Sequence, residues 1–414
     1  MTVSAGKGKV SFMKVLMVNK FLYPNGGSET YIFRLGEQLQ KQGVEVQYFG
    51  MGDKRNIVGN RAGSYTSNMD FHSGKISKFL YPFKIIYSLE ARRAIRKVLD
   101  DFQPNAVHLN NFNYQLTPSI LYEIRKYERK QGKPVKILFT AHDYQLICPN
   151  HLMRCPRTEK NCSECNGGKY RNCIRGRCIH NSALKSILGA AEGWLYRFLK
   201  TYRKIDVIIC PSAFMQKQME QHPDLRGKTV MMRNFTTVSG AGREKLPEKE
   251  NYAIYFGRYS KEKGMETLLK VCRELPDISF VFAGTGPYEE QIKKIKNIRD
   301  MGMLQEEELR PVVEKARFSI YPSEWYENCP FSVMESIQYG TPVIGADIGG
   351  IPELIRDGVT GTIFQSGCVT ELKDKIRELW SNEDKAMEYS RNCSKTNFTS
   401  VEEYALQMKQ YYTN

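Results

Sequence analysis

Features that would mark a membrane-spanning, metal-dependent or nucleic-acid-binding protein are missing from this 414-residue sequence. It has no apolar run of roughly 18 residues, so no segment is predicted to span a membrane. It has no Asp-x-Asp triplet, a common motif for a catalytic divalent metal. Zinc-finger spacing and RNP-type motifs are also absent, so nucleic acid is not expected as a partner. Residues 1–12 lack the apolar core of a signal peptide and are interpreted as a leader or tag, which favours a cytoplasmic protein.

Charge is unevenly distributed along the chain. The sequence carries 61 Lys+Arg against 45 Asp+Glu, a formal net charge of +16. Residues 1–210 hold 34 basic and 15 acidic residues, a net charge of +19, and the remainder hold 27 and 30, a net charge of −3. A chain of this length is expected to form two domains. We therefore expect the first domain to meet an anionic surface or acceptor.

Short apolar runs alternate with helical patterns through both halves, which predicts an α/β fold with two parallel, doubly wound sheets. The predicted strands lie within 14–19, 44–50, 106–110, 136–143, 207–212, 253–259, 279–287, 318–324 and 342–350. A polar stretch with Gly and Pro between about 211 and 250 separates the halves. The predicted domains are 13–215, with a Cys-rich insert at 148–178, and 216–395, followed by a helix at 396–414 that crosses back to the first domain.

The stretch ENCPFSVME places two glutamates, Glu327 and Glu335, on either side of Pro330. Proline fits the first turn of a helix but not its interior, so a helix is predicted to begin near Pro330. Glu327 is then expected in a loop and Glu335 about a turn and a half into the helix. The positive end of the helix dipole attracts anions. The arrangement therefore suits a ligand with an anionic middle and hydroxylated ends.

Other candidate residues are weaker when taken singly. GRYSKEKG places Arg258 and Lys263 after a predicted strand, where phosphates bind, although solvated basic residues in a loop are the more common explanation. The glycine pair in NGGSET and the glycines of AGTGP allow close approach of backbone to an anion, but each is more often a plain turn. His142 follows a strand at the edge where α/β sheets bind ligands, but a lone histidine is more often structural.

Two basic amphipathic segments, 77–99 and 184–204, combine an apolar helical stripe with flanking Lys, Arg and aromatic residues. One interpretation is a pair of helices packed on the core with solvated basic faces. The other is a surface that lies on anionic lipid, which would make the protein peripheral on the inner face of a membrane.

Six of the eleven cysteines crowd into one short segment: Cys148, Cys155, Cys162, Cys165, Cys173 and Cys178. Cys162 and Cys165 form a C-x2-C pair, whereas four residues separate Cys173 from Cys178. A structural zinc ion, reduced thiols and disulfides formed on isolation are the alternative interpretations.

In this order the motifs resemble those of glycosyltransferase family 4, retaining nucleotide-sugar enzymes of the GT-B fold, in which two Rossmann-like domains face each other across a cleft. The resemblance runs from KVLMVNKFLYPNGGSET to GGIPELIRDGVTGTIF, and its most specific part is PSEWYENCPFSVMESIQYGTPVIGADIGGIPE. The family's Glu-x7-Glu signature matches Glu327 and Glu335. It implies that Glu327 contacts the hydroxyls of the donor sugar and that Glu335 contacts the ribose. The implied donor-binding residues are Gly26, Gly27, Gly257, Arg258, Lys263, Gly284, Gly286, Glu327, Asn328, Phe331, Ser332 and Glu335.

The resemblance implies catalysis without a required cofactor. Arg258 and Lys263 would neutralise the leaving diphosphate in place of a metal ion. His142 would lie near the donor sugar and shape one face of its anomeric centre, without serving as a general base. The expected donor is a nucleotide sugar, with a UDP-sugar favoured and a GDP-sugar next. The expected acceptor is a lipid-linked saccharide in surface polysaccharide or glycoconjugate assembly. The rival interpretations are a non-catalytic GT-B partner subunit and a GT-B nucleotide-sugar epimerase.

Overall fold

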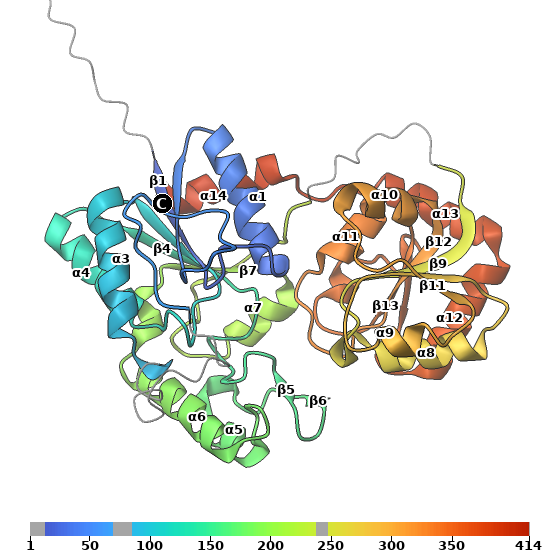
Figure 1. The fold of residues 1–414 in the computed structure, drawn as a ribbon, viewed down its shortest axis with the longest axis horizontal. Helices are drawn as coiled ribbons and strands as arrows, with labels where there is room; N and C mark the ends of the chain where they lie inside the picture. The colour runs from blue at the N-terminus through green and yellow to red at the C-terminus, as the bar shows by residue number, and fades with distance from the viewer. Residues whose placement is uncertain (1–12, 69–84, 237–246, 414) are drawn as a thin grey trace, which may run out of the picture. The chain divides into compact units, whose positions relative to one another are not determined.

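The computed structural model describes residues 13–68, 85–236 and 247–413, which divide into two compact units (Figure 1). The first unit comprises Met1–His142, Ile187–Ile209 and Glu402–Asn414. The second comprises Asp143–Ser186 and Cys210–Val401. The predicted segment 77–99 therefore lies partly outside the described residues, as does 237–246 of the predicted hinge region.

Two six-stranded sheets organise the chain. The first has the strand order β2-β1-β3-β4-β7-β8, and the second has the order β11-β10-β9-β12-β13-β14. The strands of the first sheet are β1 (Lys14–Val18), β2 (Glu45–Phe49), β3 (Ala106–Leu109), β4 (Lys136–Thr140), β7 (Val207–Cys210) and β8 (Thr229–Met231). Those of the second are β9 (Glu250–Phe256), β10 (Phe280–Ala283), β11 (Ile298–Asp300), β12 (Ala316–Tyr321), β13 (Val343–Ala346) and β14 (Gly361–Phe364). The predicted α/β fold with two parallel, doubly wound sheets is confirmed.

Helices connect successive strands and cover the sheets, as parallel pairing requires. With the first sheet are α1 (Gly27–Lys41), α3 (Leu89–Phe102), α4 (Ile120–Gln131), α6 (Ala183–Phe198) and α7 (Ala213–Met219). With the second are α8 (Met265–Glu274), α9 (Glu289–Ile292), α10 (Glu306–Lys315), α11 (Phe331–Gln338), α12 (Val369–Ser381) and α13 (Glu383–Ser394). Because helices cover both faces, the central strands β3, β10 and β12 are buried along their whole length.

The core of the second unit forms where α8 and α12 pack against its sheet. Phe280 and Phe282 of β10 lie with Phe318 of β12, and Leu268 of α8 and Leu372 of α12 complete the same cluster. All five side chains are essentially inaccessible to solvent. Burial of each such side chain stabilises the fold by roughly 1.5–3 kcal/mol. The sheet that carries the candidate site is therefore a rigid platform.

The C-terminal helix α14 (Val401–Thr413) packs in the first unit. Tyr404 shares a hydrogen bond of 2.9 Å with the Tyr31 hydroxyl, and the Tyr412 hydroxyl lies 2.7 Å from Nδ1 of His108. These buried polar contacts join the end of the chain to α1 and β3, across more than 300 residues of sequence.

The Cys-rich segment groups with the second unit, whereas the sequence-based domains place it in the first. The backbone carbonyls of Glu324 and Tyr326 accept hydrogen bonds from Arg154 and Tyr144, at 2.6 and 3.2 Å. Asn166 donates to the side chain of Gln218 at 2.8 Å. These contacts join residues that are far apart in the sequence, so composition alone could not assign the segment.

Candidate active site

Four neighbouring strands of the second sheet, β10, β9, β12 and β13, end at one carboxyl edge. The chain proceeds outward from β9 to β10 and β11, and then returns to the other side of β9 at β12. Ligands of open α/β sheets bind at such a topological switch point, beyond the carboxyl ends of the strands. Gly284 follows β10, Gly257 and Arg258 follow β9, and the loop that carries Glu327 follows β12.

The two glycine-bearing turns at this edge pack tightly on each other. Gly257, Gly284 and Gly286 have φ values of 143°, 156° and 154°, which favour glycine. A Cβ atom at Gly284 would lie 1.9 Å from the carbonyl oxygen of Gly257, and one at Gly286 would lie 2.4 Å from that of Tyr259. These glycines are therefore required by backbone packing, whether or not a ligand approaches them.

Lys263 and Glu327 form a salt bridge at the centre of the edge. Lys263 Nζ donates to Glu327 Oε1 at 2.5 Å, and the Ser323 hydroxyl donates to the same oxygen at 2.9 Å. The Tyr321 hydroxyl lies 3.3 Å from Lys263 Nζ and 3.4 Å from Glu327 Oε1. Burial alone would lower the pKa of Lys263, but the Glu327 carboxylate raises it above its ordinary value. The ammonium group therefore stays charged, in a site where Glu327 is only 6% exposed.

Arg258 and Lys263 have different surroundings, although the sequence predicted both as surface-loop residues. Arg258 is exposed, as predicted, and within the described residues its side chain has no ion pair. For Lys263 the prediction is wrong, because its side chain is only 20% exposed. The short helix Lys261–Lys263 ends at Gly264, where a Cβ atom would lie 1.8 Å from the Pro322 carbonyl oxygen. This close approach brings Lys263 against the loop after β12.

Helix α11 begins immediately after Pro330, as the sequence predicts. Its first turn carries no acidic residue, and no side chain caps its N-terminus. Glu335 is the fifth residue of the helix, and Glu327 lies in the preceding loop. Burial, with a smaller contribution from Glu306, raises the pKa of the Glu335 carboxyl to about 7. Asn328, Phe331 and Ser332, which the resemblance places at the donor, lie between the two glutamates.

A glycine pair after β13 holds the Glu327 loop in place. The Gly350 N–H donates to the Glu327 carbonyl at 2.7 Å. A Cβ atom at Gly349 would lie 2.3 Å from the same oxygen, and one at Gly350 would lie 1.8 Å from the Asn328 carbonyl. Sequence reasoning did not assign a role to this pair, although its position directly after a predicted strand was a usable signal.

Aromatic residues around Lys263 were also not predicted. The ammonium group lies 5.7 Å from the ring centre of Tyr321 and 5.5 Å from that of Trp325, within the range of cation–π attraction. Among the residues that the structure describes, the buried indole N–H of Trp325 has no hydrogen-bond partner. The aromatic run of SEWYE, just before the first glutamate of the signature, was the available signal.

The first sheet presents a different set of side chains at its own carboxyl edge. His142, two residues beyond β4, forms a 2.8 Å hydrogen bond with Asn110, which follows β3. The Tyr31 ring meets the imidazole edge-on, with centres 4.8 Å apart. Burial lowers the pKa of His142 to about 3, so the ring is neutral near pH 7. The asparagines that follow β1 and β3 were missed, although HLNN marks the end of a strand.

Gly26 and Gly27 lie at the exposed start of α1, as predicted. The first turn of this helix also contains Glu29, which is buried and accepts a 2.8 Å hydrogen bond from the side-chain amide of Asn19. A carboxylate therefore already lies at this N-terminus, in contrast to α11. This feature could not be read from the glycine pair alone.

The described part of the chain contains no ready-made metal centre and no membrane span. Across the described ranges, no three His, Cys, Asp or Glu side chains are already arranged to hold a metal ion. None of the helices found in those same ranges is both long enough and apolar enough to cross a bilayer.

Solved structures with the same architecture establish the fold. Sucrose-phosphate synthase from Thermosynechococcus elongatus superposes with a TM-score of 0.68 at 17% identity, over 97% of this chain and 98% of that one. HepE from Anabaena, solved in complex with UDP, gives a TM-score of 0.65 at 14% identity, over 97% of this chain and all of that one. The fold is therefore GT-B.

Family comparisons give the narrower assignment. The model described as Glycosyltransferase Family 4 matches residues 25–236, just over half of the chain, and the model described as Glycosyl transferases group 1 matches residues 241–396. The chain belongs to glycosyltransferase family 4, which confirms the resemblance seen in the sequence.

Curated relatives match over shorter stretches. Sulfoquinovosyl transferase SQD2 of Arabidopsis thaliana is 35% identical over 32% of this chain and 27% of its own length. Protein MJ1178 of Methanocaldococcus jannaschii, an uncharacterized glycosyltransferase, is 26% identical over 50% of this chain and 58% of its own length. The chain thus spans about a quarter to three fifths of these relatives.

Proposed function

We propose that this protein is a retaining glycosyltransferase that moves a sugar from a nucleotide-sugar donor to a saccharide acceptor. The observation that carries the proposal is the buried Lys263–Glu327 pair beside the uncapped N-terminus of α11. An ammonium group and free backbone N–H groups suit a diphosphate, and carboxylates suit sugar and ribose hydroxyls. One edge of the second sheet thus offers partners for each part of a nucleotide sugar.

The proposed mechanism stabilises the leaving diphosphate without a metal ion. Lys263 supplies a charge that is held in place before the donor arrives, and exposed Arg258 supplies a second charge that can move onto the phosphates. The positive end of the α11 dipole adds to both. Preorganised positive charge of this kind lowers the barrier because it acts where negative charge develops. The acceptor hydroxyl attacks from the leaving-group face, which gives retention.

Relatives support a nucleotide-sugar donor and favour a UDP-sugar over a GDP-sugar. Structures of HepE were solved with UDP, with UDP and glucose, and with UDP-glucose. The gpi3 subunit of phosphatidylinositol N-acetylglucosaminyltransferase from Schizosaccharomyces pombe is 21% identical over 83% of this chain and 68% of its own length. The acceptor of that relative is, by its name, a lipid. A lipid-linked saccharide acceptor is therefore part of the proposal.

A donor panel tests the proposal. The protein is incubated with UDP-, GDP- and ADP-sugars, and protection against heat and transfer to lipid-linked saccharides are measured. We expect protection by one donor class and acceptor-dependent release of nucleoside diphosphate, at a rate that EDTA leaves nearly unchanged unless it strips a structural zinc ion. Conversion of the donor sugar without an acceptor would indicate an epimerase. Neither protection nor turnover with any donor would favour a non-catalytic partner subunit.

Helix α6 supports binding to an anionic membrane. Its large apolar side chains face solvent, with Leu184 68% and Phe198 83% exposed, and Ile187 and Trp194 are exposed on the same stripe. Its buried positions include the small residues Gly189 and Ala190 together with Glu192 and Tyr196. Basic side chains flank the stripe, and a helix with this pattern suits a lipid interface. The other segment differs, because the large apolar residues of α3, apart from exposed Leu89, are buried in the core; Phe79, Tyr81 and Phe83 lie outside the described residues.

Co-sedimentation with liposomes tests this surface. Each basic residue near an anionic surface contributes about 1 kcal/mol, so several together give reversible, salt-sensitive binding. We expect binding to anionic vesicles at low salt, and its loss when Arg197, Lys200, Arg203 and Lys204 are changed to Ser. As a control, changing Lys293 and Lys294 of the second unit to Ser should leave binding intact. Absence of binding to anionic vesicles at low salt would favour a soluble acceptor.

A further inference from the structure

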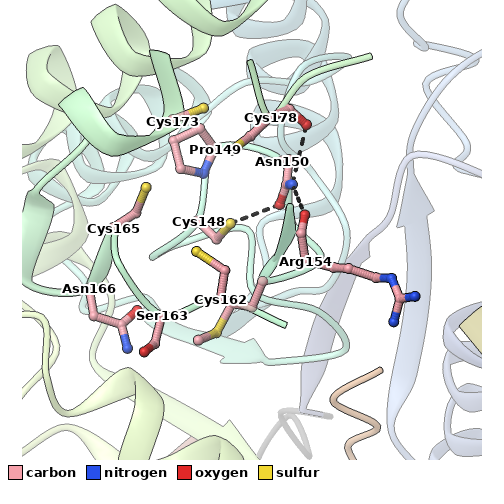
Figure 2. Close-up of a pocket in the computed structure, with 11 residues that line it drawn as sticks. Cys148, Pro149, Asn150, Arg154, Cys162, Ser163, Cys165, Asn166, Cys173 and Cys178 are labelled. Carbon is pink, nitrogen blue, oxygen red and sulfur yellow. Dashed lines mark hydrogen bonds between the residues drawn. The ribbon is translucent and has the colours of Figure 1, made fainter. Parts of the chain in front are cut away.

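Five cysteines line one small cavity in the second unit (Figure 2). The cavity has a volume of about 10 Å³, and its cysteines are Cys148, Cys162, Cys165, Cys173 and Cys178. The sixth, Cys155, lies close by, since a Cβ atom at Gly176 would be 3.4 Å from its sulfur and 2.8 Å from that of Cys178. The Cys155 thiol donates a hydrogen bond to the Gly176 carbonyl at 3.7 Å. All six thiols are free.

The segment around this cavity contains little regular secondary structure. Between Asp143 and Ser186 the regular elements are β5 (Arg154–Cys155), β6 (Lys160–Asn161), α5 (Arg171–Gly176), one short 3-10 turn and the first residues of α6. Of the ten non-glycine residues with positive φ in the described ranges, six lie here: His151, Met153, Glu159, Arg177, His180 and Asn181. A segment of about 40 residues that has so little regular structure often relies on disulfides or a metal ion to keep its shape.

Asn150 forms the hydrogen-bonded support of the cluster. Its Oδ1 accepts the thiol hydrogen of Cys148 at 2.8 Å, and its Nδ2 donates to the carbonyls of Arg154 and Cys178 at 2.6 and 3.3 Å (Figure 2). One amide thus ties together three parts of the segment that each carry cysteines. Hydrogen-bonded partners of this kind orient the ligands of metal sites.

The segment also supports the loop of the candidate active site. The Glu324 carbonyl accepts hydrogen bonds from Arg154 Nη1 at 2.6 Å and from Asn161 Nδ2 at 2.9 Å. The Tyr144 hydroxyl donates to the Tyr326 carbonyl at 3.2 Å, one residue before Glu327. Arg154 and Asn161 belong to the small hairpin β5–β6, beside the cysteine cavity. The position of Glu327 therefore depends on the shape of the Cys-rich segment.

We propose that this cysteine cluster is a structural zinc site that holds the hairpin β5–β6 against the loop before Glu327. Four thiolates from the cavity-lining cysteines would bind Zn²⁺ tetrahedrally, with Zn–S distances of about 2.3 Å. The thiols of Cys148 and Cys155 now donate hydrogen bonds to Asn150 and to the Gly176 carbonyl, so binding requires the ligand thiols to lose protons and to turn toward the cavity. Five cysteines that are not disulfide-bonded line this one cavity, and this grouping of metal-ligating side chains favours a metal over a simple hydrophobic cluster.

Metal content tests the first half of this proposal, independently of any activity. The full-length chain is purified under reducing conditions, and zinc is measured by mass spectrometry. We expect one zinc ion per chain, lost in the Cys162→Ser/Cys165→Ser variant and kept in Cys368→Ser, which alters a cysteine outside the cluster. Substitution of cobalt for zinc should give the absorption spectrum of a tetrahedral thiolate site. This measurement needs only the wild-type protein, so it tests the site even if the double variant does not fold. The zinc site is refuted if wild-type protein takes up no zinc, if the double variant retains it, or if the cluster cysteines of the native protein are disulfide-linked.

The second half of this proposal, that the hairpin β5–β6 supports the loop before Glu327, rests on the proposed function and is tested with variants of the hairpin. Changing Arg154 and Asn161 to Ala should lower kcat for transfer by about tenfold, with zinc content, melting temperature and affinity for the free nucleoside diphosphate unchanged. A matched control changes Lys160, an exposed residue of the same hairpin, to Ala and should keep full activity. Wild-type kcat in the Arg154→Ala/Asn161→Ala variant would refute support of the loop and leave the zinc result standing. If wild-type protein transfers no sugar, the proposed function fails, and the metal measurement still decides the zinc site.

Discussion

The carboxyl edges of the two sheets differ in charge, although both end a parallel α/β sheet. The second sheet presents a buried ammonium–carboxylate pair at Lys263 and Glu327, beside a helix N-terminus that no side chain caps. The first presents a neutral imidazole and amide side chains, and the helix N-terminus there already holds the Glu29 carboxylate. Charged groups suit a diphosphate, whereas neutral donors and acceptors suit sugar hydroxyls. Because of this difference in charge, we propose that the nucleotide binds at the edge of the second sheet.

Removal of the buried charge should have the largest effect. Lys263→Ala is expected to slow transfer by ~10²-fold or more, because positive charge at the leaving group is lost. It should also lower the melting temperature, because breaking a buried pair leaves Glu327 unpaired at a cost of roughly 3–5 kcal/mol. Arg258→Ala is the control: a similar loss of rate, with a wild-type melting temperature because that side chain is exposed. Wild-type turnover in both variants would exclude the proposed phosphate site.

The two glutamates should separate by role. Glu335→Gln is expected to weaken binding of the free nucleoside diphosphate by about tenfold, because a hydrogen bond from the ribose to a charged group is lost. Glu327→Gln should leave that binding nearly intact and reduce transfer. Isothermal calorimetry with the diphosphate alone measures the first effect, and steady-state kinetics measures the second. Equal loss of diphosphate affinity in both variants would contradict the division.

The pH dependence of the two edges should also differ. The pKa of Glu335 is about 7, so its carboxylate forms as the pH rises from 6 to 8, and diphosphate affinity should rise severalfold over that range. This change should be absent in Glu335→Gln, which controls for ionisation of the diphosphate itself. The pKa of His142 is about 3, so His142→Ala should lower transfer without altering the shape of the rate–pH profile between pH 6 and 8. A step near pH 6.5 in the rate–pH profile of wild type that is absent in His142→Ala would show that His142 becomes charged at the edge of the first sheet.

The smallest expected effect is on stability. Burial raises the pKa of the Glu335 carboxyl above its ordinary value of 4.5, so the folded protein favours the protonated form of this side chain. The contribution of Glu335 to the free energy of unfolding is therefore fully present below pH 4.5 and is lost as the pH rises through about 7. Glu335→Gln should therefore gain a few degrees in melting temperature relative to wild type between pH 5 and 8. Thermal unfolding of both proteins at several pH values measures this difference in melting temperature. If the difference does not change with pH, the Glu335 carboxyl is more exposed to solvent than the structure shows.

Local patterns determined much of the fold and part of the candidate site. Alternating strands and helices follow from hydrophobic periodicity, and nine of the twelve strands described in the two sheets lie where the apolar runs predicted them; β8, β11 and β14 were missed. The start of α11 follows from the backbone of Pro330, which allows the first turn of a helix and no later position. The placement of Glu327 in a loop and Glu335 within the helix follows from that one residue.

Tertiary structure alone decided which partners these residues meet. Lys263 pairs with Glu327 across 64 residues, so a lysine predicted to lie on the surface is partly buried. The segments that contain α3 and α6 have similar basic amphipathic sequences, yet α3 buries most of its large apolar residues and α6 exposes several of its own. A periodic pattern states that a helix has an apolar face, and only the neighbouring elements decide whether that face is covered. The same reason explains the Cys-rich segment, whose contacts with Glu324 and Tyr326 join residues too distant in sequence for any local rule to relate.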